Sequence, residues 1–269
     1  MVHQPGPSGV GEQVEVLGFP VAPLPLEAVA GRLASALATG ERLRVVTLNP
    51  EMLMAALNHP ELEKAIRDAD LIVPDGIGIV WALRRQGWRR QRRVTGVDLV
   101  ETLLAREQAR AQPREQTRRR LFLLGGEPGV GEEAAARIER RWPGITVAGI
   151  HHGFFSPEES AKIVSLVNQA RADLLLVGMG VPRQEIWLHQ YWPSLQVTVG
   201  IGVGGLLDLW AGRRKRAPVL LRKTGLEWVY RVWREPARWR RLKVLPAFIR
   251  MVRAEQPASR RIDEEERRW

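Results

Sequence analysis

The stretch Leu174–Glu185 reads LLLVGMGVPRQE, and it contains the local pattern that decides the fold. A short apolar run, Leu174–Val177, ends in the turn Gly178-Met179-Gly180. Pro182 then opens a helical pattern, at a position where proline is favoured because its missing N–H would have no partner in any case. Strand, glycine turn and helix follow one another closely, as they do in parallel α/β proteins.

The same pattern recurs along the chain on both sides of this stretch. We expect strands at Val14–Leu17, Arg44–Leu48, Leu71–Val73, Leu121–Leu124, Thr146–Ile150, Leu174–Val177 and Val197–Ile201. We expect helices at Leu24–Leu37, Glu51–Ala69, Ile77–Leu83, Glu132–Trp142 and Pro157–Ala170, and a further helix that starts at Pro182. The sequence therefore predicts a Rossmann-like α/β fold, a mostly parallel sheet with helices on both faces. Its functional site should lie at the carboxyl ends of the strands.

Composition divides the chain into four parts. Residues 1–12 are a flexible leader rich in Pro and Gly, and residues 13–212 form the α/β domain. Residues 213–253 form a basic, helical C-terminal appendage, and the charge-dense tail 254–269 is expected to be disordered. Two basic stretches, 84–93 and 106–120, interrupt the α/β pattern. We expect the first to be a mobile surface loop and the second to be a loop or a frayed helix end.

The appendage carries nearly all of the net charge. From Arg213 to Lys243 there are 12 Arg or Lys residues and two Glu residues, a balance of +10, whereas the whole chain has +11. Apolar residues between Leu226 and Trp233 recur at helical spacing among these cations. A basic, aromatic segment on a nearly neutral body indicates a polyanionic partner, such as membrane headgroups, a lipid diphosphate or nucleic acid.

Several classes of protein are excluded or disfavoured by composition. The chain has no cysteine, which excludes disulfides, thiolate metal sites and cysteine nucleophiles. Its first residues lack the basic start and apolar core of a signal peptide, and no apolar run approaches the roughly 18 residues of a spanning helix. No HxH or HExxH pattern appears, and we expect no metal and no other cofactor. A cytoplasmic or peripheral protein is predicted.

Polar residues follow the first strands of the predicted domain. Asp75 could act as a general base toward a hydroxyl group, or it could cap the helix Ile77–Leu83, a common role for Asp. Thr47 and Asn49 could orient a substrate or cap a turn. Asp98 has the same two interpretations as Asp75.

Two glycine turns are candidates for binding phosphate. The turn Gly125–Gly131, which includes Gly126, could hold a phosphate with its backbone amides, or it could be a plain tight turn. Its spacing is not GxGxxG, and no Walker lysine follows. Gly180 precedes Gln184 and Glu185, which could grip a diphosphate-sugar. A Glu in the first turn of a helix also complements the helix dipole.

Taken in order, these motifs resemble the WecG/TagA/CpsF family of bacterial glycosyltransferases. The similar stretches are Thr47–Glu51, Asp75–Gly78, Arg93–Asp98, Leu123–Gly126, Gly153–Phe155, Gly178–Glu185, Gly202–Gly205, Ala211–Gly212, Arg216–Pro218 and Gly225–Arg241. The resemblance covers about residues 14–250. No single motif is specific, but the ordered set is.

The resemblance implies an inverting, metal-independent hexosyltransferase. It would move an N-acetylmannosamine-type sugar from a UDP-sugar to GlcNAc linked to polyprenyl diphosphate, in the synthesis of cell-surface polysaccharide or teichoic acid. Asp75 is then the general base, and Thr47 and Gln184 are polar residues of the active site. The arginines implied for the appendage are Arg231, Arg238 and Arg241. The predicted substrate-binding set is completed by Asn49, Arg93, Asp98, Gly125, Gly126, Gly180 and Glu185.

The implied partners are the UDP-sugar, the lipid-linked acceptor and the anionic inner face of the cytoplasmic membrane, which residues 213–253 would contact. A homo-oligomer in solution is also implied, and nucleic acid is not expected as a partner. The residues themselves leave two alternatives open. A nucleotide-binding oxidoreductase is disfavoured by the GxxGxG spacing, and a basic nucleic-acid-binding protein is disfavoured by the apolar stripe of Trp228 and Trp233.

Overall fold

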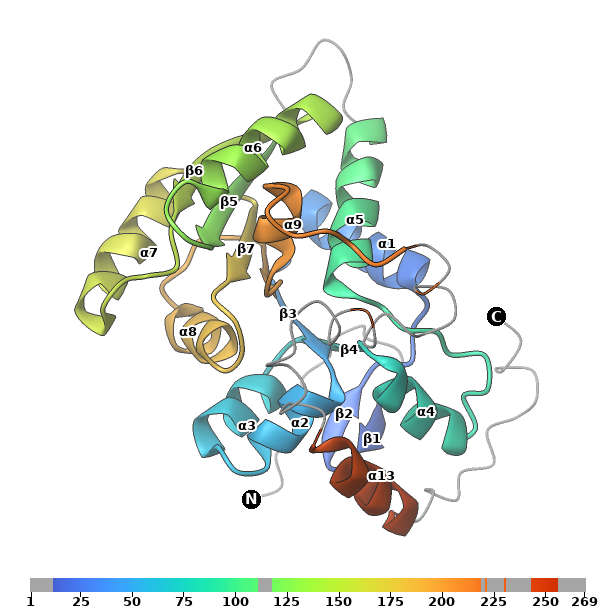
Figure 1. Ribbon diagram of the computed structural model, residues 1–269. Helices are drawn as coiled ribbons and strands as arrows, with labels where there is room; N and C mark the ends of the chain where they lie inside the picture. Colours follow the sequence, from blue (N-terminus) through green and yellow to red (C-terminus); the bar gives the residue numbers. More distant parts are fainter. Residues whose placement is uncertain (1–11, 111–117, 219–220, 222–229, 231–242, 256–269) are drawn as a thin grey trace.

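Six parallel strands form the central sheet of the protein, seen in a computed structural model (Figure 1). The structure describes residues 12–110, 118–218, 221, 230 and 243–255. The strand order is β4-β3-β8-β7-β5-β6. The strands are β3 (Leu43–Leu48), β4 (Leu71–Pro74), β5 (Arg119–Gly125), β6 (Ile145–His151), β7 (Leu174–Gly178) and β8 (Val199–Gly202). The predicted fold, a mostly parallel sheet between helices, is confirmed.

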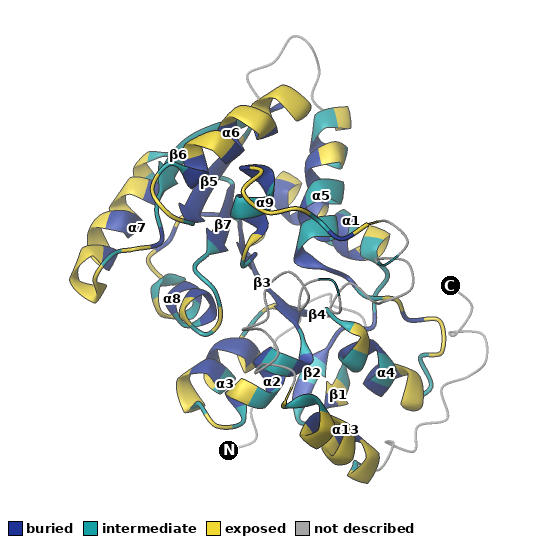
Figure 2. Ribbon diagram, in the orientation of Figure 1, coloured by how far each residue is buried: buried dark blue, intermediate teal, exposed yellow. Residues whose placement is uncertain are grey.

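Helices cover both faces of this sheet. One face is covered by α1 (Leu26–Thr39), α5 (Gly96–Arg110), α6 (Val130–Arg141) and α9 (Leu206–Trp210). The other face is covered by α2 (Pro50–Ala56), α3 (Pro60–Arg67), α7 (Ser160–Gln169) and α8 (Arg183–Tyr191). Successive strand residues point to opposite faces, so that Leu121 and Leu123 pack under the first group and Phe122 under the second. Buried residues accordingly line the inner sides of the helices, and exposed residues line their outer sides (Figure 2).

The N-terminal strand lies outside the main sheet. Strand β1 (Val14–Val16) pairs antiparallel with β2 (Phe19–Val21) through a turn at Leu17 and Gly18, both with positive φ. The expected strand Val14–Leu17 therefore exists, but it belongs to a two-stranded hairpin. Helices α4 (Ile77–Arg85) and α13 (Leu245–Ala254) share an apolar cluster with this hairpin and α2.

The predicted helix Glu51–Ala69 is two helices in the structure. Helix α2 ends at Ala56, and α3 begins at Pro60, where a proline fits the first helical turn but would break a helix interior. His59 caps α3, since its side chain accepts a hydrogen bond from the backbone N–H of Leu62. A short 3₁₀ turn, Pro157–Glu159, likewise precedes α7 in the predicted helix Pro157–Ala170.

Of the two interpretations of residues 106–120, the helix end holds for the residues up to Arg110, and the loop interpretation is wrong at both ends of the stretch. Residues up to Arg110 belong to α5, and Arg119 begins β5. Their cations pair with acids: Arg119 Nε lies 2.6 Å from Glu107 Oε2, and Arg110 Nη1 lies 3.4 Å from Glu107 Oε1. Because Glu107 is buried, these arginines are its counterions rather than solvated loop residues. Residues 111–117 lie outside the described residues.

The loop prediction for residues 84–93 holds only in part. The first two residues end α4, and residues 86–93 contain no helix or strand.

Most of the predicted leader, appendage and tail lies outside the described residues. The described appendage consists of residues 213–218, 221, 230 and 243–253, of which 245–253 belong to α13. Ala254 ends α13, and residues 256–269 of the predicted tail are not described. Within the part of the chain that the structure describes, no helix combines the length and the apolar character needed to cross a bilayer.

Candidate active site

The first wall of the candidate site is formed by the carboxyl ends of β3 and β4. These strands pair in parallel, with Thr47 opposite Val73, so Asn49 and Asp75 follow as neighbours on adjacent strand ends. The backbone N–H of Asp75 donates to the Leu48 carbonyl oxygen at 2.8 Å, which extends the ladder by one bond. Thr47 is buried, whereas Asn49 and Asp75 are half-buried. The structure therefore brings together the three polar residues predicted at these strand ends.

Asn49 and Asp75 differ in their local roles. Asn49 is the N-cap of α2, and its Oδ1 accepts a hydrogen bond of 2.9 Å from Met52 N. The capping interpretation is thus confirmed for Asn49. The N-cap of α4 is Gly76, whose φ of 79° turns the chain sharply after Asp75. The N-cap interpretation of Asp75 is therefore wrong, and its role as a general base stays a prediction.

The start of α5 forms a second wall beside Thr47. The backbone N–H of Val94 donates to the Pro74 carbonyl oxygen at 2.7 Å, so the chain returns to the end of β4 before α5 begins. A Cβ atom on Gly96 would lie 3.6 Å from Thr47 Oγ1. Arg93, a predicted substrate-binding residue, is half-buried at this return. The predicted residues from both stretches thus lie at one edge of the sheet.

A floor of glycines continues from this wall across the ends of the other strands. We call Gly125, Gly126, Gly153, Gly178 and Gly204 the glycine shelf. Neighbouring turns bond through it: Gly126 N donates to Gly178 O at 3.2 Å, and Gly153 N donates to Gly126 O at 2.9 Å. A Cβ atom on Gly125 would overlap the Gly178 carbonyl, and one on Gly178 would lie 2.7 Å from Gly204 O. Only glycine lets the turns pack this closely.

Some of the predicted glycines serve packing, and one borders open space. Gly126 packs against Val130 at the start of α6, and Gly125 packs against Gly178. Gly180, with φ of 77°, has no atom of the described residues within 4 Å of the position that a Cβ would take. Gly204, with φ of 53°, is equally open on that side. These two residues border space in which a ligand can approach the backbone.

Gln184 joins the two turns that contain these open glycines. Its Oε1 accepts hydrogen bonds from Gly180 N at 3.1 Å and from Gly204 N at 3.0 Å. Its Nε2 donates to Glu185 Oε1 at 2.7 Å, and both side chains are buried. The sequence predicted the pair as groups that touch a ligand. The structure instead assigns Gln184 a role inside the protein, holding the β7–α8 and β8–α9 turns together.

Glu185 has an unusual environment for a carboxyl group. Burial raises its pKa to about 7, although the hydrogen bond from Gln184 acts in the opposite direction. Its Oε2 is buried and has no hydrogen-bond partner among the described residues. The position of Glu185 does not favour contact with a substrate, because its side chain is only 3% exposed.

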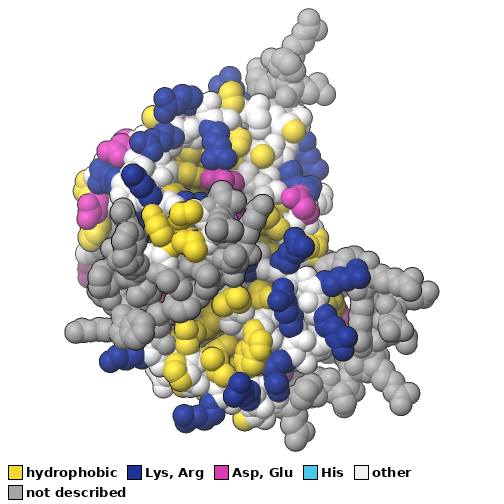
Figure 3. Space-filling model, turned by 45° about the vertical axis from the view of Figure 1, so that its right-hand side comes forward, with side chains coloured by type: hydrophobic (Ala, Val, Ile, Leu, Met, Phe, Trp, Pro, Cys, Tyr) yellow, Lys and Arg dark blue, Asp and Glu magenta, His cyan; other side chains and the backbone are white. Residues whose placement is uncertain are grey.

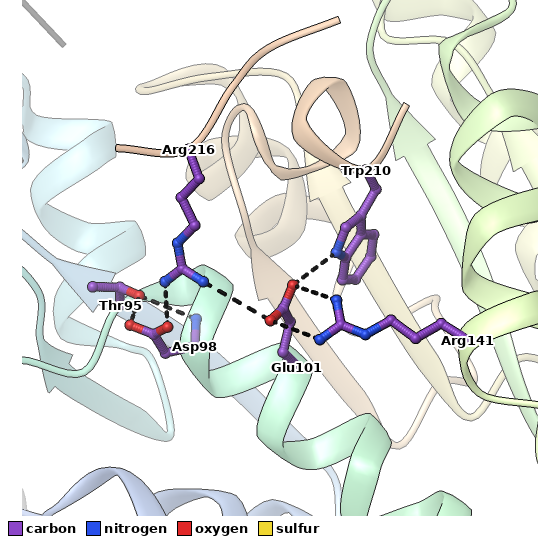
Figure 4. A network of polar contacts seen from close by, with 6 residues as sticks. All are labelled: Thr95, Asp98, Glu101, Arg141, Trp210 and Arg216. Carbon is purple, nitrogen blue, oxygen red and sulfur yellow. Dashed lines mark hydrogen bonds and ion pairs between the residues drawn. The ribbon is translucent and has the colours of Figure 1, made fainter. Parts of the chain in front are cut away.

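Asp98 is held in a network of polar contacts (Figure 4). Thr95 Oγ1 donates to Asp98 Oδ2 at 2.7 Å and accepts from Asp98 N at 3.1 Å, a reciprocal cap on α5. Arg216 Nη2 donates to Asp98 Oδ1. Burial acts to raise the pKa of Asp98, but the hydrogen bonds from Arg216 and Thr95 and the charges of Arg216 and Arg93 outweigh it and hold the pKa below its usual value. Thr95 caps α5 and Asp98 lies in the first turn of that helix, so the N-cap interpretation of Asp98 is wrong, and its contact with a substrate stays a prediction.

The same network fixes the beginning of the appendage. Arg216 Nη1 also lies 3.8 Å from Glu101 Oε2, and Trp210 Nε1 donates to Glu101 Oε1 at 3.3 Å. Arg213 pairs with Glu133 of α6, at 3.0 Å. Part of the cationic charge assigned to the appendage is therefore neutralised by acids of the α/β body. The sequence did not reveal these partners, because they lie far from the arginines along the chain.

Three predicted site residues, Arg231, Arg238 and Arg241, lie outside the described residues. Among the residues that are described, no three His, Asp or Glu side chains gather in a way that could hold a metal ion. Independence from metal stays a prediction.

Comparison with known proteins gives consistent matches over most of the chain. The model of a family described as "Glycosyl transferase WecG/TagA/CpsF family" matches residues 14–262. A protein of Bacillus spizizenii is 34% identical over 215 residues, which cover 80% of each chain. A protein of Staphylococcus aureus is 35% identical over 207 residues, 77% of this chain and 78% of the relative. Both are named N-acetylglucosaminyldiphosphoundecaprenol N-acetyl-beta-D-mannosaminyltransferase.

Proposed function

The chain belongs to the WecG/TagA/CpsF family and is a glycosyltransferase, and we propose that it transfers an N-acetylmannosamine-type sugar from a UDP-sugar to GlcNAc linked to polyprenyl diphosphate. The family resemblance predicted from the motifs is confirmed by the match over residues 14–262. Among the structural observations, the one that carries the proposal is the placement of Asp75 on the strand end beside Thr47, at the same sheet edge as the glycine shelf.

The glycine shelf is the proposed site of the nucleotide donor. Gly180 and Gly204 leave room for a ligand next to the backbone, and Gln184 fixes the two turns relative to each other. Backbone amides in glycine turns suit phosphate oxygens. We assign Gly125, Gly126 and Glu185 to the support of this shelf, because their surroundings are filled by protein atoms.

Asp75 is the proposed general base. Its carboxylate accepts the proton of the acceptor hydroxyl as that oxygen attacks the anomeric carbon of the donor sugar. The new C–O bond forms as the bond to the diphosphate oxygen breaks, and UDP leaves from the opposite face, so the anomeric configuration is inverted. Thr47, next to Asp75 in the sheet, orients the reacting groups with its hydroxyl. A positioned base contributes about 10²–10⁴-fold to such a reaction.

The departing diphosphate needs positive charge, which arginines can supply without a metal. The family resemblance assigns this role to Arg231, Arg238 and Arg241 of the appendage, and we retain it as part of the proposal. Arg93 lies at the same edge of the sheet as Asp75 and is a further candidate. Asp98 is assigned a supporting role, because its carboxylate binds Arg216 and Thr95.

We place the enzyme at the inner face of the cytoplasmic membrane, where a polyprenyl-linked acceptor would be bound. One face of the molecule carries hydrophobic side chains bordered by Lys and Arg (Figure 3). Ile77 and Met251 are exposed apolar residues, at the start of α4 and on α13. Apolar groups among cations suit an anionic lipid surface. Assembly into a homo-oligomer away from the membrane remains part of the proposal.

The proposal is tested by UDP release from a panel of UDP-sugars, with a short-chain lipid-diphosphate-GlcNAc acceptor and with EDTA present. We expect release that requires acceptor and occurs with UDP-N-acetylmannosamine or its uronate. The product linkage, read by NMR, should have the inverted anomeric configuration. Activity that EDTA abolishes would refute metal independence, and release with a different sugar only would refute the proposed donor. The oxidoreductase and nucleic-acid alternatives have no support in the family match.

A further inference from the structure

Helix α13 packs against the starts of α2 and α4, the two helices that follow the polar strand ends (Figure 1). Phe248 is the centre of this contact and is fully buried. Its Cε1 lies 3.2 Å from the position that a Cβ on Gly78 would take, and Pro50 Cγ lies 2.5 Å from that same position. The ring of Phe248 and the ring of Pro50 thus fill the space beside Gly78.

This contact lies directly behind the turns that carry Asn49 and Asp75. Pro50 follows Asn49, and Gly78 lies three residues after Asp75. Between them, a Cβ on Gly76 would lie 3.3 Å from Pro50 Cδ and 3.6 Å from Asn49 Cβ. Phe248 and Pro50 thus both pack beside Gly78, and Pro50 also packs beside Gly76, the residue that follows Asp75.

Two further contacts hold α13 in place. Val252, one turn after Phe248, is buried in the same apolar cluster. Glu255, just after the helix, accepts a hydrogen bond of 2.8 Å from the backbone N–H of Leu17 through its Oε1. Ile249 and Met251 lie on the same helix and are 39% and 37% exposed. The helix therefore has one face packed on the body and one face turned away from it.

We propose that Phe248 is a positioning residue for the transfer reaction, an inference that rests on the glycosyltransferase function proposed above. The turn after β4 contains Gly76 and Gly78, which restrict the backbone less than other residues do. Packing against this segment adds to the hydrogen bond from Asp75 N to Leu48 O in fixing the position of Asp75, and the Phe248 ring supplies part of that packing. A shift of about 1 Å in a catalytic group can lower a rate about 10²-fold. Phe248 acts through the turn and does not touch the substrate.

The docking of α13 is thereby coupled to the geometry of the base. With Phe248 seated, the turns after β3 and β4 are held against each other through Pro50 and Gly78. With Phe248 withdrawn, the space beside Gly78 is empty, and the turn of Asp75 loses one of its packed sides. The C-terminal appendage therefore influences the site through the contact of Phe248 with Gly78. This contact does not involve the arginines of the appendage.

The test compares Phe248→Ala with Ile249→Ala in the full chain. Ile249 is the matched control, because it is the next residue of the same helix but points away from the body. We expect Phe248→Ala to lower kcat at least tenfold while the donor KM changes less than about twofold, and Ile249→Ala to resemble the wild type. The pH profile of kcat should also shift on its acidic limb for Phe248→Ala. Phe248→Leu, which restores most of the buried volume, should recover most of kcat.

Hydrogen exchange of the peptide that spans residues 71–83 supplies a readout independent of activity. Phe248→Ala should raise exchange in this peptide at least tenfold, whereas Ile249→Ala should not. If the alanine variant does not fold, Phe248→Leu is measured in its place. Wild-type kcat and wild-type exchange in folded Phe248→Ala or Phe248→Leu would overturn the inference. An inactive wild type in which Phe248→Ala still loosens the peptide would overturn the proposed function alone.

Discussion

Gln184 and Glu185 are successive residues of α8 whose side chains bond to each other inside the protein. Gln184 Nε2 donates to Glu185 Oε1 at 2.7 Å, and each side chain is 3% exposed. The amide oxygen of Gln184 in turn holds Gly180 and Gly204 through their backbone N–H groups. A buried carboxyl with a raised pKa thus supports the turns of the glycine shelf, and the stability of the protein should depend on its protonation.

Glu185→Gln should stabilise the protein at alkaline pH more than at acidic pH. The ordinary pKa of Glu is 4.5, and burial raises that of Glu185 to about 7. Between these values the folded protein binds more protons than the unfolded chain, so the free energy of unfolding falls as pH rises, by up to roughly 3 kcal/mol. Glutamine keeps the acceptor for Gln184 and removes the titration. Tm measured at pH 5 and pH 8 checks this, with the exposed Glu61→Gln as control. Equal changes in Tm at both pH values would contradict it.

Gly180→Ala and Gly40→Ala should differ in catalysis but not in stability. Both glycines have positive φ, 77° and 79°, and in the described part of the chain no atom lies within 4 Å of the Cβ position of either. The backbone strain should therefore be similar, about 1 kcal/mol in each variant. Gly40 follows α1 at the opposite edge of the sheet, whereas Gly180 borders the proposed donor site. We expect a donor KM raised roughly tenfold, equal to about 1.4 kcal/mol, in Gly180→Ala only. Unchanged donor KM would remove Gly180 from the binding surface.

Asp75→Asn should lower kcat about 10²–10⁴-fold, because an amide cannot accept the proton of the acceptor hydroxyl. The side chain keeps its size, so the free energy of unfolding and the affinity for UDP should change little. Asp68→Asn is a suitable control, since Asp68 pairs with Lys64 and His189 on the outside of α3 and α8. Steady-state rates at saturating donor and acceptor provide the measurement. Turnover near that of the wild type would exclude Asp75 as the base.

Asp98→Asn and Arg216→Gln should show non-additive effects on stability. The two side chains bond directly, at 33% and 20% exposure, so removing either one leaves the other without its main partner. We expect a coupling free energy on the order of 1 kcal/mol at neutral pH in a double-mutant cycle. Since the pKa of Asp98 is lowered on folding, this contribution should vanish as pH falls through that lowered pKa. The exposed pair Lys64 and Asp68 should give a smaller coupling. Additive effects at Asp98 and Arg216 would argue against the pairing.

The strands and their order of appearance could be predicted from the sequence because their signal is local. Runs such as Leu174–Val177 end in glycine, and the next helix starts within a few residues. Pairing is not local, which is why Val14–Val16 was expected without its hairpin partner. Charge also misled the prediction. Arg110 and Arg119 suggested a loop, but in the structure both arginines pair with the buried carboxylate of Glu107.

The location of the site at a set of strand ends could be predicted from the sequence, but the role of each residue within it could not. Asp75 and Thr47 come to the same sheet edge because neighbouring strands are parallel, a consequence of the fold class. Gln184 could not be recognised as a support for two turns, because its partner Gly204 lies 20 positions away. Arg216 and Asp98 are separated by 118 positions, and nothing in either local sequence indicates the other.

The hydrogen bond between Leu17 and Glu255 joins residues 238 positions apart, and it has a consequence for how the protein is made. The hairpin, α2 and α4 leave the ribosome early, whereas α13 leaves it after every other described element. The apolar surface around Pro50 and Gly78 therefore stays uncovered by α13 through most of translation. We expect a nascent chain to offer this surface to chaperones until its last helix has been synthesised.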